Sequence, residues 1–180
     1  MAVKPTIKGI FVKSHIRALR RKKGELAVRE LERRFGKPLR FKNSESVAVR
    51  DEVRLLELIV DITHRKRLTP RQRAYQAGRL HFQNFATTPF ARIIFSLFKK
   101  RFKMLLLQAQ NIAGHVFRGV RFTSQSLGPK SISLIMENND YPIEHFRGLF
   151  QSWMTFAGLS GSVSARTIAP KTYQYIFRWR

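Results

Sequence analysis

The sequence of 180 residues contains no cysteine. This absence excludes a disulfide framework, a thiolate nucleophile and a zinc site with cysteine ligands. The sequence also lacks the Gly-x-x-x-x-Gly-Lys loop that holds nucleotide phosphates. The five histidines occur in none of the short spacings typical of metal ligands; they are His15, His64, His81, His115 and His145. We therefore predict no metal and no cofactor, and interpret the histidines as hydrogen-bonded structural residues.

Acidic residues are scarce, with 11 Asp and Glu against 35 Lys and Arg, which gives a formal net charge of +24. Glu137, Asp140 and Glu144 lie together at the predicted start of a helix, where carboxylates favour the helix dipole and cap the backbone. We prefer this interpretation to a general acid/base pair. Ser160 and Ser162 lack the strand–turn–helix context of a nucleophile. The sequence therefore predicts that the protein is not an enzyme.

Long uncharged apolar segments are missing as well. The most apolar stretch, residues 89–113, is interrupted by Lys99, Lys100, Arg101 and Lys103, whereas a membrane-spanning helix needs about 20 apolar residues with few charges. The first residues lack the apolar segment of a signal peptide. We expect a soluble, cytoplasmic protein.

What is present is a folded composition, with 43% hydrophobic residues and 15 Phe. The length fits one domain, residues 1–180. Within it we expect a basic N-terminal strand and helices (1–50), a helical layer (51–117) and a sheet-and-helix unit (118–180).

In the first two segments, apolar alternation predicts a strand over 7–13, with Gly9 as a bulge or a point of close backbone approach. Ser14 is the predicted N-cap of the next helix. Further helices are predicted over 25–36 and 50–66, and after Thr69-Pro70 and Thr88-Pro89. In the helix over 50–66 we assign the polar positions to Glu52, Arg54, Glu57 and Asp61. Gly78 is expected to let another backbone come close.

The third segment has the clearest pattern. Alternation of Ile132, Leu134 and Met136 predicts a strand, preceded by a loop over 124–131. Asp140 is the predicted N-cap of a helix that ends at Gly158. An antiparallel hairpin follows over 161–166 and 172–180. The predicted fold class is α+β, with helices packed on a small antiparallel sheet and a C-terminal strand–helix–strand–strand unit.

These patterns resemble a known family. The stretches KGIFVKSHIRAL, ELERRFGKPLRF, AGRLHFQNFATTPFARIIFSLF and ENNDYPIEHFRGLFQSWMTFAGL are similar to a myxobacterial paralogous family of about 180 residues and unknown function. The strand–helix–strand–strand order also resembles the nitric-oxide-signalling and Golgi-transport ligand-binding fold. That topology implies a dimer and a role in binding a small ligand or a partner. The cysteine cluster that many sensors of that fold carry is absent here.

The excess of basic residues forms three clusters, which we predict to bind an anion; they are Arg17, Arg20, Arg21, Lys22 and Lys23; Arg65, Lys66, Arg67, Arg71 and Arg73; and Lys99, Lys100, Arg101 and Lys103. Lys and Arg at helix ends suit phosphate contacts. The alternative is a basic, solvated surface.

A second set of residues can line a pocket: His115, Arg118, Tyr173, Tyr175 and Trp179. His115 is a candidate contact to a ligand or to haem, and the three aromatic residues alternate along the last predicted strand. The predicted function is a non-enzymatic regulatory binding module for an anionic partner, with nucleic acid (DNA or RNA) first and a nucleotide second. Two alternatives stay open: a small-ligand sensor of the nitric-oxide-signalling fold type, and a scaffold that dimerises or binds a protein partner through its Phe-rich helices.

Overall fold

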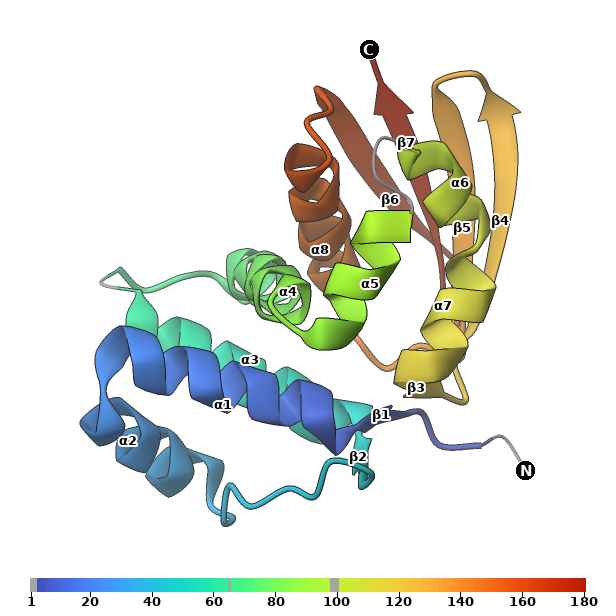
Figure 1. Cartoon of the computed structure of the whole chain (residues 1–180). Coiled ribbons are helices and arrows are strands. Elements are labelled where there is room, and N and C mark those ends of the chain that lie inside the picture. Colours follow the sequence, from blue (N-terminus) through green and yellow to red (C-terminus); the bar gives the residue numbers. More distant parts are fainter. Residues whose placement is uncertain (1–2, 65, 98–100) are drawn as a thin grey trace.

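The computed structural model describes residues 3–64, 66–97 and 101–180 of the chain (Figure 1). Helices and strands follow one another in the described residues as β1 (Thr6–Lys8), α1 (Gly9–Lys23), α2 (Glu25–Phe35), β2 (Ser46–Ala48), α3 (Val49–Thr63), α4 (Pro70–Ala86), α5 (Pro89–Leu97), α6 (Phe102–Leu107), α7 (Ala109–Val116), β3 (Phe117–Arg118), β4 (Arg121–Gly128), β5 (Ser131–Glu137), α8 (Ile143–Phe156), β6 (Gly161–Ala169) and β7 (Thr172–Trp179). This is the predicted α+β class.

The C-terminal half is built on a four-stranded antiparallel sheet in the order β4-β5-β7-β6. Its inner face carries alternating apolar residues that are fully buried, as predicted for Ile132, Leu134 and Met136 on β5. Tyr175 and Phe177 continue this face on β7. Helices α6, α7 and α8 pack against the sheet on this side.

The N-terminal half is mostly helical. Strands β2, β1 and β3 form a small antiparallel sheet that joins the start of the chain to the start of β4. Helix α4 lies between the two halves, because it contacts α1 and α3 on one side and packs most extensively on α8 on the other (Figure 1). One hydrophobic core, which includes Ile7, Leu55 and Phe177, therefore runs through both halves.

Two glycines allow α4 and α8 to cross at backbone contact. A methyl group on Gly78 would lie 1.7 Å from the carbonyl oxygen of His145, and one on Gly148 would lie 2.1 Å from the carbonyl oxygen of Tyr75. The expected close approach at Gly78 is confirmed. The crossing fixes the neighbouring side chains of the two helices against each other.

The N-terminal strand is shorter than predicted. Residues 7–13 alternate like a strand, but β1 ends at Lys8 and α1 already begins at Gly9. Ser14 is therefore inside the helix rather than its N-cap, and its hydroxyl donates to the carbonyl of Phe11 at 2.6 Å. Gly9 does mark a close backbone approach, because a methyl group there would lie 2.2 Å from the carbonyl oxygen of Lys42.

Two predictions in the C-terminal half are also wrong. The polar stretch over 124–131 is largely strand, because β4 is an edge strand whose side chains are mostly exposed and need not be apolar. Asp140 is not the N-cap of α8, whose N-cap position is Pro142. The Asp140 carboxylate instead pairs with Lys171 at 2.7 Å and with Arg50 at 3.2 Å.

The stretch after Thr88-Pro89 is divided. Helix α5 is described as far as Leu97, α6 begins at Phe102 after Arg101, and a break at Gln108 separates α6 from α7. In the parts of the chain that the structure describes, no helix is long and apolar enough to cross a membrane.

Candidate functional site

An apolar cavity lies between α4, α7, α8 and the inner face of the sheet. It has a volume of about 80 Å³. Among the residues that the structure describes, nearly all that line the cavity are apolar; they include Phe82, Ala113, Val116, Phe122, Leu134 and Trp153. The exception is His81, which connects the cavity to a polar cluster deeper in the helical layer.

Six side chains form this cluster, which we call the buried network: His15, Glu52, His81, Asn84, Tyr141 and His145. They come from α1, α3, α4, α8 and the turn before α8. All are at most 5% exposed, and Glu52, His15 and His145 are fully buried. Such groups are costly to bury unless they bond to one another.

Glu52 is the centre of the buried network. Its Oε1 lies 2.9 Å from Nε2 of His15 and 3.8 Å from Nε2 of His81. The hydroxyl of Tyr141 donates to its other oxygen, Oε2. Both carboxylate oxygens are therefore in contact with polar groups contributed by other elements.

The outer members of the buried network hold the two inner histidines. The side-chain amide of Asn84 lies 3.1 Å from Nδ1 of His15. Nδ1 of His81 lies 3.0 Å from Nε2 of His145. Nδ1 of His145 is buried and has no hydrogen-bond partner among the residues that the structure describes. The buried network therefore ends on an unsatisfied ring nitrogen.

Burial sets the charge state of the buried network. Burial by itself raises the pKa of the Glu52 carboxyl, but His81 and the hydrogen bonds from His15 and Tyr141 lower that pKa to about 2. Burial lowers the pKa of His81 to about 4 and the pKa of His145 well below its usual value. Burial raises the pKa of Tyr141. At neutral pH the network thus combines a carboxylate with neutral His81 and His145 rings and a neutral phenol.

The residues predicted to form a pocket are spread over the molecule, and none is among the described residues that line the apolar cavity. His115 is exposed, with its ring 6.0 Å from that of Phe90. Tyr175 is fully buried on the inner face of the sheet. Arg118 is exposed on β3, whereas Tyr173 and Trp179 are half-buried on β7, the same strand as Tyr175.

Two basic clusters lie at one end of the helical layer. Arg17, Arg20, Arg21, Lys22 and Lys23 are all exposed on α1. Arg21 and Lys22 border a groove that is also lined by Thr63, the last residue of α3. The second cluster follows Thr63 in the sequence.

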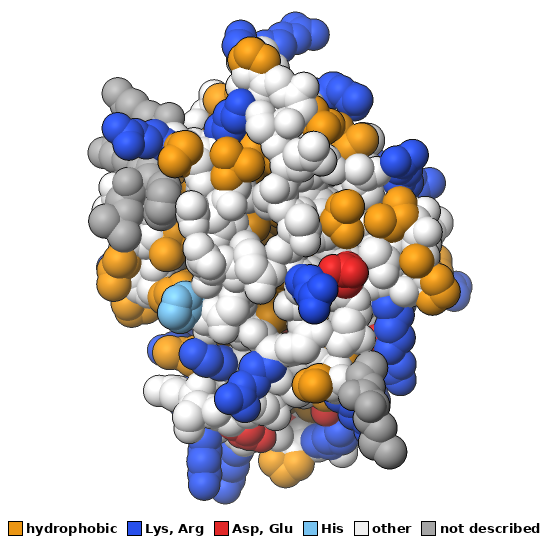
Figure 2. Space-filling view, turned by 90° about the vertical axis from the view of Figure 1, so that its right-hand side faces the viewer, with side chains coloured by type: hydrophobic (Ala, Val, Ile, Leu, Met, Phe, Trp, Pro, Cys, Tyr) orange, Lys and Arg blue, Asp and Glu red, His pale blue; other side chains and the backbone are white. Residues whose placement is uncertain are grey.

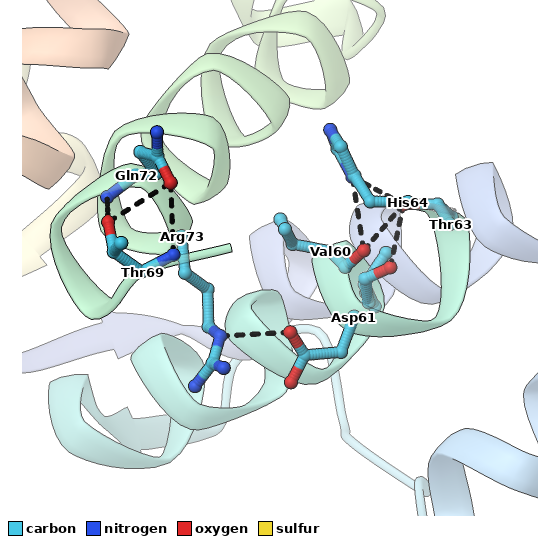
Figure 3. A network of polar contacts seen from close by, with 8 residues as sticks. Val60, Asp61, Thr63, His64, Thr69, Gln72 and Arg73 are labelled. Carbon is cyan, nitrogen blue, oxygen red and sulfur yellow. Dashed lines mark hydrogen bonds and ion pairs between the residues drawn. The ribbon is translucent and has the colours of Figure 1, made fainter. Parts of the chain in front are cut away.

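Of the cluster after α3, Arg65 lies outside the described residues. Lys66 and Arg67 are exposed. Arg71 pairs with Glu144 at 2.8 Å, and Arg73 pairs with Asp61 at 2.9 Å beside the capping box of Thr69 and Gln72 (Figure 3). Part of this charge is therefore satisfied within the protein.

The third cluster lies elsewhere. Lys99 and Lys100 are outside the described residues. Arg101 is exposed, and Lys103 donates to the carbonyl of Gly128 at 2.7 Å. On the side of the molecule seen in Figure 2, Lys and Arg side chains lie in separate groups between uncharged surface. Anion binding at the three clusters stays a prediction.

The buried network was not found by sequence reasoning. His15, His81 and His145 were treated singly, and Glu52 was assigned to the polar side of its helix. Glu52 instead lies on the same face as Leu55, Leu56 and Ile59, three to seven residues further along α3, and all four are buried. In the sequence, the sign of this burial is that the charged Glu52 stands at helical spacing from three apolar residues, Leu55, Leu56 and Ile59.

Solved H-NOX domains have a similar structure. One reported under "Structural insights into the molecular mechanism of H-NOX activation" has a TM-score of 0.73 at 16% identity, over 97% of both chains. An oxygen-binding H-NOX domain related to soluble guanylate cyclases has a TM-score of 0.72 at 15% identity, over 97% of this chain and 95% of that chain. The Fe(II) unliganded H-NOX protein from K. algicida has a TM-score of 0.66 at 13% identity, over 97% of both chains.

At these identities the likeness shows the fold, which agrees with the resemblance predicted from the strand–helix–strand–strand order. No curated protein matches the sequence significantly. The family model described as "Protein of unknown function (DUF2378)" matches residues 2–180. Because this match extends over nearly the whole sequence, the chain belongs to that family.

Proposed function

We propose that this protein is a non-enzymatic sensor module that takes a small apolar molecule into its apolar cavity. The observation that carries the proposal is the cavity itself, which lies between α4, α7, α8 and strands β3, β4 and β5 and is lined almost wholly by apolar groups. The cavity offers a water molecule few hydrogen-bond partners. It therefore favours an apolar ligand.

The volume limits the size of the ligand. The cavity of about 80 Å³ is well above the ~10–15 Å³ that one water needs, and about half of the ~150 Å³ in an engineered cavity that takes benzene or xenon. A molecule of a few heavy atoms fits, such as a diatomic gas. The oxygen-binding H-NOX domain with a similar fold supports this ligand class.

Haem does not fit this cavity. A porphyrin ring is many times larger than the space available, and haem iron needs an axial protein ligand such as histidine. His81 is the one histidine among the described lining residues, and its two ring nitrogens face His145 and Glu52. His115, the candidate from the sequence, is exposed and away from the cavity.

The position of the cavity gives a route from binding to a response. Its walls include α4, which packs on the N-terminal helices, and α8, which packs on the sheet. A ligand shifts a conformational equilibrium only if it binds the two states differently. A molecule that fills this cavity favours the arrangement in which α4, α7 and α8 close around it.

Xenon is a suitable probe, because it is apolar and compact. We expect NMR spectra of the protein under xenon to show shifts at residues that line the cavity, including Ala113 and Leu134. Ala113→Leu should abolish these shifts, since it adds three carbons inside the cavity, while the melting temperature stays equal or rises.

Gly114→Ala is the matched control. It adds a methyl group to the same helix at a position with open space around it, so xenon binding should be unchanged. A wild-type spectrum that xenon leaves unaltered, or shifts that persist in Ala113→Leu, would contradict the proposal. A homodimer and a protein partner stay predictions from the sequence.

A further inference from the structure

We propose that His15, Glu52 and His81 form a binding site for a divalent transition metal ion, with two imidazole nitrogens and one carboxylate oxygen as ligands. These three residues come from α1, α3 and α4 and are all buried. The site goes beyond the proposed sensor function and departs from the sequence-based expectation of no metal.

The donor atoms already face a common centre. Nε2 of His15 and Oε1 of Glu52 are 2.9 Å apart, Nε2 of His81 and the same oxygen are 3.8 Å apart, and the donor atoms of the three residues all lie within 4.8 Å of one another. A metal ion with bonds of ~2.0–2.2 Å keeps its ligand atoms about 3–4 Å apart. Small side-chain adjustments therefore suffice to coordinate an ion.

Each proposed ligand is oriented by a second buried group. The side-chain amide of Asn84 lies 3.1 Å from Nδ1 of His15, and Nε2 of His145 lies 3.0 Å from Nδ1 of His81. When His15 binds an ion through Nε2, its Nδ1 carries the proton, and the amide oxygen of Asn84 is then the atom that accepts it. Tyr141 donates to the oxygen of Glu52 that is not facing the histidines. Metal-binding histidines and carboxylates in proteins are held in this manner, with the outer atom of each ligand bonded to a neighbour.

The protons of His81 and His145 can be placed in two ways. If His81 donates from Nδ1 to His145, its Nε2 lone pair faces the carboxylate of Glu52 at 3.8 Å, and two acceptors oppose each other. If His145 donates instead, His81 carries its own proton on Nε2, toward Glu52. Nδ1 of His145 has no partner in the described chain in either arrangement. An ion between His81 and Glu52 suits the first arrangement, because it uses the lone pair and separates the two acceptors.

The charge state also suits a cation. Metal ions bind ionised carboxylates and neutral imidazoles. Glu52 offers a carboxylate oxygen and His15 and His81 offer imidazole nitrogens on the same side. A divalent ion compensates the fully buried negative charge, which is otherwise costly.

The surface lies nearest to the proposed site at one groove. This groove of about 430 Å³ between α1, α3 and α4 is lined by His15 and Asn84, whereas Glu52 and His81 are not among its described lining residues. Two nitrogens and one oxygen suit Zn²⁺, Fe²⁺ or Co²⁺ better than Mg²⁺ or Ca²⁺, which prefer oxygen ligands. Three protein ligands leave at least one coordination position open.

The test uses the full chain, stripped of metal with a chelator and then titrated with Co²⁺ by absorption and with Zn²⁺ by calorimetry. We expect one ion per chain and visible Co²⁺ bands. Glu52→Gln, which keeps the shape of the side chain, and His81→Gln should each weaken binding at least 100-fold. His115→Gln, the matched control at an exposed histidine, should bind like the wild type.

Asn84→Ala keeps the proposal testable if the ligand variants fail to fold. This variant retains all three ligands and loses one positioning contact, so we expect affinity to fall 10–100-fold. A folded, stripped wild type that binds neither ion overturns the proposal. Equal affinity in Glu52→Gln, His81→Gln and the wild type would also overturn it, because the ion would then be held elsewhere.

The proposals for the metal site and for the apolar cavity are tested independently of each other. Ala113→Leu fills the cavity and leaves His15, Glu52 and His81 in place, so it should bind Co²⁺ normally. Glu52→Gln should still show the xenon shifts.

Discussion

At the residue scale, Glu52 shows how one buried charge is made acceptable. It is fully buried and lies between His15, His81 and Tyr141. Removing one partner of a buried charge is generally more damaging than removing a surface ion pair, because the remaining charge is left without compensation. Exposed pairs such as Arg20 with Glu25 contribute little by comparison.

The low pKa values in the buried network predict that acid destabilises the protein. Burial lowers the pKa of His81 to about 4 and the pKa of His145 well below its usual value, whereas both titrate near 6.5 when unfolded. Below pH 6.5 the unfolded chain therefore binds more protons than the folded one. The free energy of unfolding should fall by up to about 1.4 kcal/mol per pH unit for each of these histidines.

Urea unfolding at pH 7.5, 6.5, 5.5 and 4.5 measures this slope. Glu52 acts in the same direction at lower pH, since its folded pKa of about 2 lies below the unfolded value of 4.5. His115→Gln is the control, because it removes an exposed histidine that is not part of the buried network. A flat profile between pH 6.5 and 4.5 would show that the buried histidines are already charged in the folded protein.

At the element scale, some helix ends follow from local chemistry alone. Thr69 and Gln72 form a complete capping box, and Gly24 and Gly36 end their helices with positive φ angles of 80° and 72°. The strand over 7–13 was overestimated because local alternation fits a strand, while the position of α1 is decided by contacts with a distant loop. Local spacing predicts Asp140 as the N-cap of α8. Its carboxylate instead pairs with Lys171 and Arg50, which are distant in the sequence but close in three dimensions.

The crossing of α4 and α8 predicts a large effect of one methyl group. Gly78→Ala places Cβ within bonding distance of a backbone oxygen, so the two helices must move apart. We expect a loss of about 3 kcal/mol in the free energy of unfolding, at the upper end of overpacking effects. Chemical denaturation of the purified variant measures the change.

Gly114→Ala makes the same substitution in α7, where the added methyl group meets open space. It should stabilise the protein slightly, by up to about 1 kcal/mol, because alanine favours the helix. Equal stabilities of the two variants would show that the crossing can widen at no cost.

At the scale of the whole molecule, the net charge of +24 is the excess of 35 basic over 11 acidic side chains, so ion pairs within the protein leave it unchanged. The predicted anionic partner is tested by titrating labelled DNA, RNA and cyclic dinucleotides at rising salt. Binding driven by phosphate contacts should weaken steeply as salt increases. Reversing the charge of Arg20, Arg21, Lys22 and Lys23 to Glu should reduce the affinity at least tenfold for every sequence.

A second quadruple reversal makes the same change in net charge on the sheet, at the exposed residues Arg121, Lys130, Arg166 and Arg178. It should have a much smaller effect than reversal on α1. If both variants lose a similar amount of affinity, binding depends on the total charge of the protein rather than on the α1 cluster. If none of these ligands binds even at low salt, the prediction of an anionic partner is wrong.

The site was less predictable than the fold for a physical reason. Spacing rules for ligands work within one helix or loop, whereas the pairs in the buried network are separated by 29 to 89 residues. Alternation gave the inner face of β5 correctly, because burial there depends on strand geometry alone. The buried network depends on how four helices meet, and no local pattern carries that information.

The long separations also have a consequence during synthesis. His15 and Glu52 leave the ribosome long before Tyr141 and His145, which belong to the last quarter of the chain. Until then the carboxylate of Glu52 lacks the phenol that bonds its second oxygen, and enclosing it is unfavourable. The N-terminal helices can form as they emerge, but their packing around Glu52 is completed only when translation is nearly finished.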